Sequence, residues 1–248
     1  MYVSGPLTSE LRMKILLIFT LLLISGGGES WGVIGYSGGG VVIKWRYDTD
    51  CISDLKYFCT GAGSCRKKPI WAVAKNKWIH SGRFSLLDDT DAELFWVLIR
   101  ELTVEDSGTY LCGVNKNWGT DVVKPVELKV EEDLSYKKSI SVTSHVGGSV
   151  NISCKYSQSH SSYPKFLCRR LHFVNCRYTT SVKESRRWIN EGKFSLYDDR
   201  VKQIFTVSFN SLTEGDSGEY RCGAESYWIS DHEYKVYITQ IILRVTGE

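Results

Sequence analysis

The sequence is poor in proline and methionine and carries no large excess of charge of either sign. Its 248 residues include only 4 Pro and 2 Met, and the formal net charge is +3. A charge this small does not indicate a nucleic-acid partner, because such partners are usually bound through strongly basic faces. The 42% of hydrophobic and 24% of charged residues are typical of a folded globular chain and exclude a disordered one.

Catalytic and metal-binding motifs are also missing from the sequence. The five histidines lack a spacing such as His-Glu-x-x-His; they are His80, His145, His160, His172 and His232. The cysteines do not form the Cys-x-x-Cys pairs of zinc sites. We therefore expect neither an enzyme nor a cofactor, and we assign no metal site.

A single long apolar run lies near the amino terminus. It covers residues 14–24, KILLIFTLLLI, and is followed by a serine and three glycines. A membrane span needs about 20 apolar residues, so this run is too short to cross a bilayer and is typical of a signal peptide. We predict a signal peptide over residues 1–28, with Met13 as an alternative start. The rest of the chain is then extracellular, where its 8 cysteines would form disulfides.

The remainder of the chain contains an internal repeat. Several segments of the first half match segments of the second, among them GRFSLLDD at 82–89 and GKFSLYDD at 192–199. Within each copy the apolar residues alternate over short runs, which is the period of half-buried strands. We predict an all-β protein of two tandem two-sheet sandwiches, one over residues 31–131 and the other over residues 132–248.

The segments DSGTYLC at 106–112 and DSGEYRC at 216–222 resemble the F-strand signature of immunoglobulin variable-type domains. The resemblance implies that the tyrosine of each segment bonds through its hydroxyl group to the backbone at the start of the strand. It also implies that the aspartate of each segment pairs with a cation at the start of strand D. The residues concerned are Arg83, Asp106 and Tyr110 in the first copy and Lys193, Asp216 and Tyr220 in the second.

Each copy also has a cysteine directly after the aromatic position of strand C and another a few residues later. With KYFC at 56–59 and KFLC at 165–168, this arrangement resembles the polymeric immunoglobulin receptor and its leukocyte relatives, the mono-immunoglobulin-like (CMRF-like) receptors of myeloid cells. The resemblance covers nearly all of the chain after the signal peptide. It implies a bridge between strands B and F and a short-loop bridge across strands C and C′. The implied bridges are Cys154–Cys222, Cys168–Cys176 and Cys59–Cys65.

The first copy departs from this pattern, because Trp45 occupies the strand-B position of Cys154 and an additional Cys51 follows it. Three interpretations remain. Cys51 pairs with Cys112 if the B–C loop folds over the core; or Cys112 stays a buried thiol while Cys51 is exposed and free to crosslink another chain; or Trp45 is an allelic or sequencing difference from cysteine. Losing such a bridge from a small secreted domain costs about 2–5 kcal/mol, so hydrophobic contact of Trp45 over Cys112 is a candidate for compensation.

Binding in variable-type domains usually involves the loops at one end of the sandwich. In the first copy the candidate residues are Asp48, Asp50, Asn117, Trp118 and Asp121. An exposed tryptophan beside oxygen ligands could insert into a lipid surface with a cation bridging to phosphate, as the similar T-cell immunoglobulin and mucin receptors imply. The alternative, which we favour, is that Trp118 packs on its own hairpin.

The second copy has two further surface features. Arg169 and Arg170 belong to a group of arginines that could face an acidic ligand such as a sialylated glycan or a phospholipid headgroup; a solvated sheet face is at least as good an interpretation. Asn151 begins an Asn-Ile-Ser glycan acceptor sequence and is expected on the solvent face of strand B.

The resemblance implies a non-catalytic ectodomain that recognises an extracellular ligand: an anionic lipid, a glycan or an immunoglobulin. In that family such domains stand on a membrane span, followed by a tail that signals or pairs with an adaptor. This chain stops at Glu248 without a span. We expect part of a plasma-membrane receptor exposed on the extracellular face, with a secreted decoy of the same ligand as the alternative. A cell-adhesion module would share every fold residue above.

Overall fold

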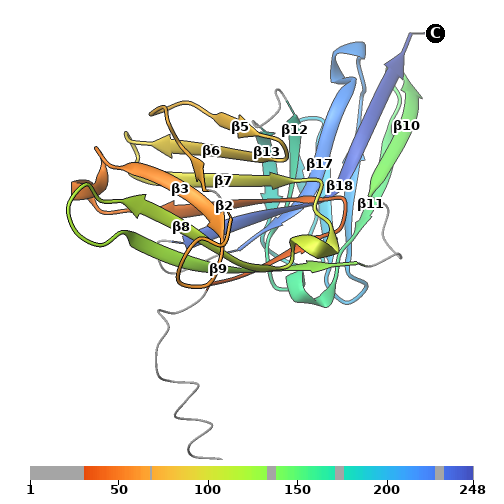
Figure 1. The fold of residues 1–248 in the computed structure, drawn as a ribbon. Helices are drawn as coiled ribbons and strands as arrows, with labels where there is room; N and C mark the ends of the chain where they lie inside the picture. Colours follow the sequence, from red (N-terminus) through yellow and green to blue (C-terminus); the bar gives the residue numbers. More distant parts are fainter. Residues whose placement is uncertain (1–30, 68, 133–137, 171–175, 227–231, 248) are drawn as a thin grey trace, which may run out of the picture.

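The structure, a computed structural model, describes residues 31–67, 69–132, 138–170, 176–226 and 232–247. These residues form two β-sandwich domains (Figure 1). The signal peptide predicted over residues 1–28 lies outside the described residues. Within the described part of the chain, no helix is long and apolar enough to cross a membrane.

The first domain packs two sheets face to face. Its strands are β1 (Trp31–Tyr36), β2 (Gly40–Arg46), β3 (Leu55–Thr60), β4 (Ile70–Trp71), β5 (Ile79–Ser81), β6 (Phe84–Asp89), β7 (Leu94–Arg100), β8 (Gly108–Asn115) and β9 (Val122–Glu131). One sheet has the order β1-β9-β8-β3-β4, and the facing strands have the order β2-β7-β6-β5. Because β1 pairs with β9 and not with β2, the outer edge of β2 has no partner strand from its own domain.

The second domain repeats this arrangement. Its strands are β10 (Ser139–His145), β11 (Val150–Lys155), β12 (Lys165–Arg170), β13 (Cys176–Val182), β14 (Ile189–Glu191), β15 (Phe194–Asp199), β16 (Ile204–Phe209), β17 (Gly218–Glu225) and β18 (His232–Thr246). One sheet contains β13-β12-β17-β18 with β10 paired to β18, and the other has the order β11-β16-β15-β14. The predicted all-β pair of sandwiches is confirmed.

The repeat in sequence is also a repeat in register. Leu86 on β6 pairs with Val97 on β7, and Leu196 on β15 pairs with Val207 on β16. All four side chains are fully buried. Because side chains alternate between the two faces of a strand, the same apolar alternation places the same positions in both cores.

The turn into strand F has one geometry in both domains. The hydroxyl group of Tyr110 donates to the backbone oxygen of Asp106 at 2.8 Å, and that of Tyr220 donates to the backbone oxygen of Asp216 at 2.8 Å. Each bond ties the buried tyrosine ring to the short 3₁₀ turn that precedes its strand. The turn is therefore fixed before the strand enters the core.

The aspartates of these turns also hold the cations that precede strand D. Arg83 donates two hydrogen bonds of 2.7 Å to the carboxylate of Asp106. Lys193 donates one bond of 2.6 Å to the carboxylate of Asp216. The arginine pair lowers the pKa of Asp106, chiefly through these hydrogen bonds.

Disulfides distinguish the two cores. The described residues contain Cys59–Cys65, Cys154–Cys222 and Cys168–Cys176. The bridge between the facing sheets is thus present in the second domain. In the first domain Trp45 lies on β2, is 6% exposed, and belongs to the same core cluster as the buried Cys112.

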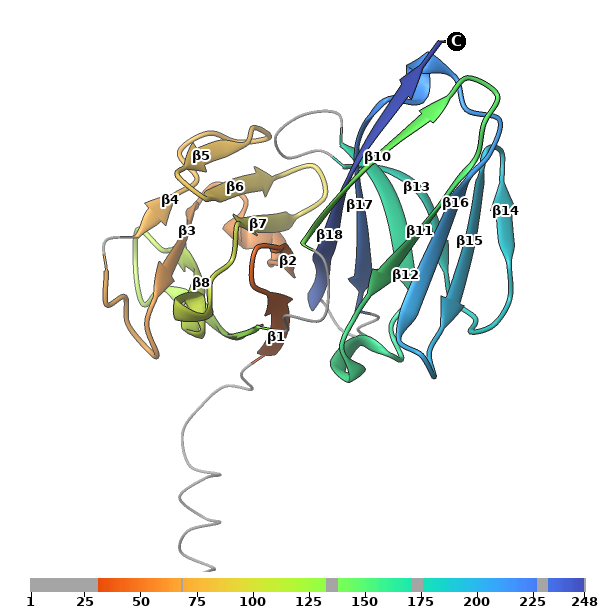
Figure 2. The same ribbon diagram turned by 90° about the vertical axis from the view of Figure 1, so that its right-hand side faces the viewer.

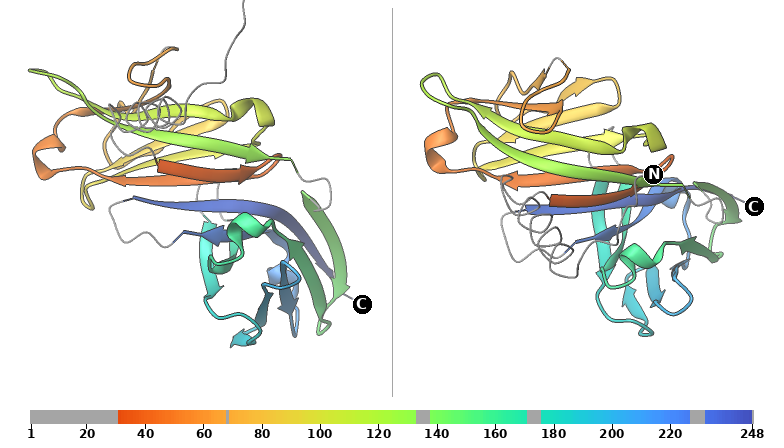
Figure 3. Two further views of the ribbon diagram at one scale, coloured as in Figure 1. Left: turned by 90° about the horizontal axis from the view of Figure 1, so that it is seen from below. Right: turned by 60° about the horizontal axis from the view of Figure 1, so that its bottom comes forward.

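The two domains share one continuous sheet. The first part of β18, from His232 to Tyr237, pairs antiparallel with β2 and extends the sheet to the order β13-β12-β17-β18-β2-β7-β6-β5. Figures 2 and 3 show β18 alongside β2 between the two sandwiches. Gly39 permits the approach, because a Cβ atom there would lie 2.3 Å from the backbone oxygen of Tyr237. The free edge of β2 is therefore covered by the second domain.

Candidate ligand-binding site

The candidate site is the end of the first domain that points away from the second. The 3₁₀ turn Thr49–Cys51 after β2 and the β8–β9 hairpin meet there (Figure 1). Loops held by a rigid scaffold are the usual place for binding residues. The loop candidates from the sequence lie in these two segments, except Asp48, which directly precedes the 3₁₀ turn.

A buried lysine holds the first loop from below. Lys56, at the start of β3, donates from Nζ to the backbone oxygens of Cys51 at 2.6 Å and Asp54 at 3.0 Å. Its Nζ is also 3.3 Å from the carboxylate of Asp88 and 3.9 Å from the centre of the Tyr47 ring. Burial lowers the pKa of Lys56 to about 8, and the Asp88 carboxylate partly opposes that shift. The loop carbonyls thus have a fixed charged donor beneath them.

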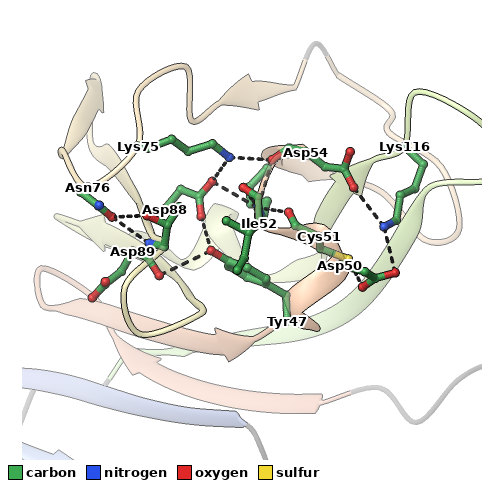
Figure 4. A network of polar contacts seen from close by, with 12 residues as sticks. Tyr47, Asp50, Cys51, Ile52, Asp54, Lys75, Asn76, Asp88, Asp89 and Lys116 are labelled. Atoms are coloured by element: carbon green, nitrogen blue, oxygen red, sulfur yellow. Dashed lines mark hydrogen bonds and ion pairs between the residues drawn. The ribbon is translucent and has the colours of Figure 1, made fainter.

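Asp88 connects this lysine to neighbouring elements. Tyr47 donates to one of its carboxylate oxygens at 2.7 Å, and Lys75 donates to the other at 2.6 Å. Lys75 also donates to the backbone oxygen of Asp54 at 2.7 Å. Figure 4 shows Tyr47, Lys75 and Asp88 converging beneath the loop. With Lys56, the network links four separate segments of the first domain.

Lys116 joins the loop to the β8–β9 hairpin. Its Nζ lies 3.0 Å from the carboxylate of Asp54 and 3.5 Å from that of Asp50 (Figure 4). The hydrogen bond to Asp54 is the main cause that raises the pKa of Lys116. Asp50 is therefore engaged with the hairpin, although its side chain is largely exposed.

Asp121 supports the hairpin. Its carboxylate accepts hydrogen bonds from the Asn115 side chain at 3.2 Å and the Lys116 backbone at 3.2 Å. It also accepts a bond of 3.1 Å from the hydroxyl group of Tyr57. Burial, together with this bond, raises the pKa of Tyr57 to about 12. The carboxylate of Asp121 thus fixes the base of the hairpin.

Trp118 lies at the tip of the hairpin with 92% of its surface exposed. The expectation that it packs on its own hairpin is wrong. The following Gly119 has a φ of +107°, a backbone conformation at the hairpin tip that glycine adopts readily. Asn117 and Asp48 are also exposed. Among the described residues no group of three or more metal-ligating side chains is present.

The second domain contains the same internal support. Lys165, at the start of β12, donates to the backbone oxygens of His160 at 2.7 Å and Tyr163 at 2.5 Å. Its Nζ is 3.5 Å from Asp198 and 4.0 Å from the centre of the Tyr156 ring. Burial lowers the pKa of Lys165 to about 8. A lysine, an aspartate and a tyrosine therefore form the same cluster in both domains.

Comparison with known protein families identifies the family of both domains. Residues 39–131 and 137–246 match the model of the immunoglobulin V-set domain. The chain belongs to the immunoglobulin V-set family. In V-set terms β2, β3, β8 and β9 are strands B, C, F and G of the first domain, and the candidate site is its B–C and F–G loop end.

Curated relatives narrow the similarity to one group of V-set receptors. The human polymeric immunoglobulin receptor is 27% identical over 214 residues, which cover 83% of this chain and 26% of the receptor. The human CMRF35-like molecule 2 is 31% identical over 98 residues, which cover 40% of this chain and 48% of that protein. The solved ectodomain of a teleost fish polymeric immunoglobulin receptor is 26% identical, with a TM-score of 0.36, over 89% of this chain and 98% of that structure. The resemblance inferred from the cysteine pattern is confirmed, and the chain spans about a quarter of the length of the receptors it matches first.

The B–C loop of the second V-set domain contacts the first domain. The hydroxyl group of Tyr36, on β1, lies 2.7 Å from Nδ1 of His160 and 3.0 Å from Oγ of Ser157. Glu131 accepts a bond of 3.2 Å from Ser159 in the same loop. Burial, with Lys165 nearby, lowers the pKa of His160 to about 4. The B–C loop of the second domain is thus part of the joint between the domains.

The structure contradicts both the expected Cys51–Cys112 bridge and the expected exposure of Cys51, and it confirms that Cys112 is a buried thiol. Cys51 and Cys112 are not bonded to each other, and both are buried. An exposed Cys51 that crosslinks another chain is therefore wrong, because the 3₁₀ turn brings this side chain to 3% exposure. Burial raises the pKa of Cys112 to about 12, which keeps it a neutral core side chain. A sequence difference at Trp45 stays a prediction.

The arginines of β12 are already engaged within their own domain. Arg169 donates to the backbone oxygens of Gly215 at 2.7 Å and Ser217 at 2.9 Å. Arg170 donates to the carboxylate of Glu219 at 2.7 Å. Asn151 is exposed on β11, at the edge of its sheet, so glycosylation there stays a prediction that the geometry permits.

The buried lysine clusters were not identified from the sequence, although their residues were in view. Lys56 and Lys165 open the two matching Lys-aromatic motifs, and Asp88 and Asp198 lie in the matching Phe-Ser-Leu segments. A lysine at a fully buried strand position breaks the apolar alternation, and its recurrence in both copies was the available signal.

Proposed function

We propose that this chain is the ligand-recognition region of a non-catalytic extracellular receptor and that the first domain carries the recognition surface. The observation that carries this proposal is Trp118, which is 92% exposed at the tip of the β8–β9 hairpin. The B–C loop of the second domain, by contrast, is bonded to Tyr36 and Glu131 of the first domain. Exposed aromatic side chains on rigid supports are frequent anchors in binding sites.

The ligand that the similarity favours is an immunoglobulin. The relatives that cover most of this chain are named polymeric immunoglobulin receptors, and they match both of its domains. The Asp50–Lys116 and Asp54–Lys116 pairs make the loop end rigid, which lowers the entropy lost on binding a protein surface. As in those relatives, we place the chain on the extracellular face of the plasma membrane; secretion and adhesion are the alternatives.

A lipid surface is the second candidate, and Trp118 is the specific reason. An exposed indole at a loop tip can enter the interfacial region of a bilayer. Asp121 is held by three hydrogen bonds inside the hairpin, so it does not offer a free carboxylate to a bridging cation. Lipid binding by this tip would therefore be independent of calcium.

The test is binding of the purified chain to immobilised polymeric immunoglobulin and to anionic and neutral liposomes, with calcium and with chelator. Trp118→Ala should lower affinity at least tenfold for the true ligand class. Trp188→Ala is the matched control, because Trp188 is half-exposed in the second domain, where it packs on Tyr197. Equal losses in both variants, or none in Trp118→Ala, would remove the first-domain loop end as the site.

A further inference from the structure

A cavity lies at the joint between the two domains, away from the loop end described above. Its volume is about 180 Å³. The lining consists of Gly38, Gly39, Arg100 and Glu101 from the first domain and Lys138, Arg170, Arg221 and residues 237–240 from the second. Four of these side chains are cationic, and they come from four different segments.

Two of the cations are held in place by one carboxylate. Arg170 donates to one oxygen of Glu219 at 2.7 Å, and Arg221 donates to the other at 3.1 Å. The guanidinium group of Arg221 also lies 5.1 Å from the centre of the Tyr237 ring. Glu219 therefore orients both arginines and neutralises one of their two charges.

The other two cations have no carboxylate partner in the part of the chain that the structure describes. Arg100 donates from one Nη to the backbone oxygen of Gly82 at 2.8 Å, and its Nε is buried without a hydrogen-bond partner. Lys138 donates to Oγ of Ser37 at 3.1 Å. A buried guanidinium nitrogen without an acceptor is costly. Arg100 and Lys138 thus bring to the cavity positive charge that no described carboxylate pairs with.

We propose that this cavity binds a sulfate or phosphate group. Among the residues that the structure describes, the cavity brings four cationic side chains together with the carboxylates of Glu101 and Glu219, so cationic groups predominate and a tetrahedral oxyanion suits them. Guanidinium groups suit such oxyanions because their nitrogens donate in parallel pairs. Pockets for whole drug-sized ligands are about 300–1,000 Å³. This cavity is smaller and therefore admits one charged group.

The donors come from both domains, so the anion has a structural consequence. Arg100 belongs to the end of β7 and Arg221 to β17, on opposite sides of the β2–β18 seam. A bound dianion would contact both domains at once and stabilise their present arrangement. Binding should therefore also slow hydrogen exchange in β2 and in the first part of β18.

The experiment is calorimetric titration of the purified chain with inorganic sulfate and with inorganic phosphate at constant ionic strength. We expect one site per chain, and at least a tenfold weaker affinity in Arg100→Gln/Lys138→Gln. The matched control is Lys77→Gln/Lys202→Gln, which removes one exposed cation from each domain away from the cavity. Lys138→Gln alone, at an exposed position, gives a smaller loss in the same direction if the double variant does not fold.

Two further measurements test whether the anion is bound as a free ion or as an ester, and separate this proposal from the proposed ligand-binding function. Glucosamine 6-sulfate and phosphoserine test whether the group is recognised as an ester; binding of inorganic sulfate or phosphate alone supports a site for the free ion. Trp118→Ala must leave sulfate affinity unchanged. Sulfate binding no stronger than chloride binding, or an equal loss in the Lys77/Lys202 control, overturns the proposal.

Discussion

The two domains have the same fold but differ in the contact that links their facing sheets. Each has a buried lysine, Lys56 or Lys165, that bonds loop carbonyls from below. Only the second has a disulfide between its facing sheets, Cys154–Cys222; the first has Trp45 in the corresponding core. The shared lysine and the differing link show that the loop support is independent of the inter-sheet bridge. A V-set domain can thus keep its loop end in place without that bridge.

The largest effect should come from removing the shared lysine. We expect Lys56→Met to destabilise the first domain, and Lys165→Met the second, by about 3–5 kcal/mol, because each leaves buried loop carbonyls without their donor and removes the cation of a buried ion pair. Domain-resolved hydrogen exchange measures both. An effect confined to one domain would contradict the equivalence of the two clusters.

Reducing the disulfides should destabilise the second domain more than the first, by a somewhat smaller amount than the loss of the buried lysine. Reducing Cys154–Cys222 removes the inter-sheet bridge of the second domain and should lower its stability by about 2–5 kcal/mol. The first domain has no equivalent bridge to lose. The first domain loses only the short Cys59–Cys65 loop. Exchange rates with and without reductant should therefore rise more in β11 and β17 than in β2 and β8. The comparison fails if both domains respond alike.

Acidification should act on the joint chiefly through His160 of the second domain. His160 and Cys51 occupy corresponding places, since each offers its backbone oxygen to the buried lysine. The folded pKa of His160 is lowered to about 4 from 6.5, so the unfolded chain binds more protons in that interval. Stability is thus present above pH 6.5 and lost as the pH falls toward 4, by about 1.4 kcal/mol per unit at most.

The variant His160→Gln checks this assignment. Gln keeps a hydrogen-bonding side chain near Tyr36 but does not titrate, so the pH dependence between 6.5 and 4 should flatten in β1, β2 and β18. Glu131, whose pKa is lowered, titrates near the same loop in both proteins and cancels in the comparison. An unchanged pH profile would show that another group governs the joint.

The sequence was sufficient for the fold because its signals are local. The Asp-Ser-Gly-x-Tyr-x-Cys segments place Tyr110 and Tyr220 at the same turn, and two-residue alternation defines the strands. The joint could not be predicted, because it depends on pairing between the edges of β2 and β18, which no short pattern encodes. The exposure of Trp118 and the burial of Cys51 depend on loop geometry in the same way.

The smallest difference between the domains is the cation at the start of strand D. Arg83 donates two hydrogen bonds to Asp106, whereas Lys193 donates one to Asp216. Both cations are partly exposed, so exchanging them should cost less than about 1 kcal/mol. We expect Arg83→Lys to lower stability slightly and Lys193→Arg to leave it equal or raise it, because a guanidinium group matches a carboxylate in two places. Chemical denaturation at low and high salt measures both effects. A loss of stability above 1 kcal/mol in Arg83→Lys would mean that the Arg83–Asp106 pair supplies part of the stabilisation in the first domain that the Cys154–Cys222 bridge supplies in the second.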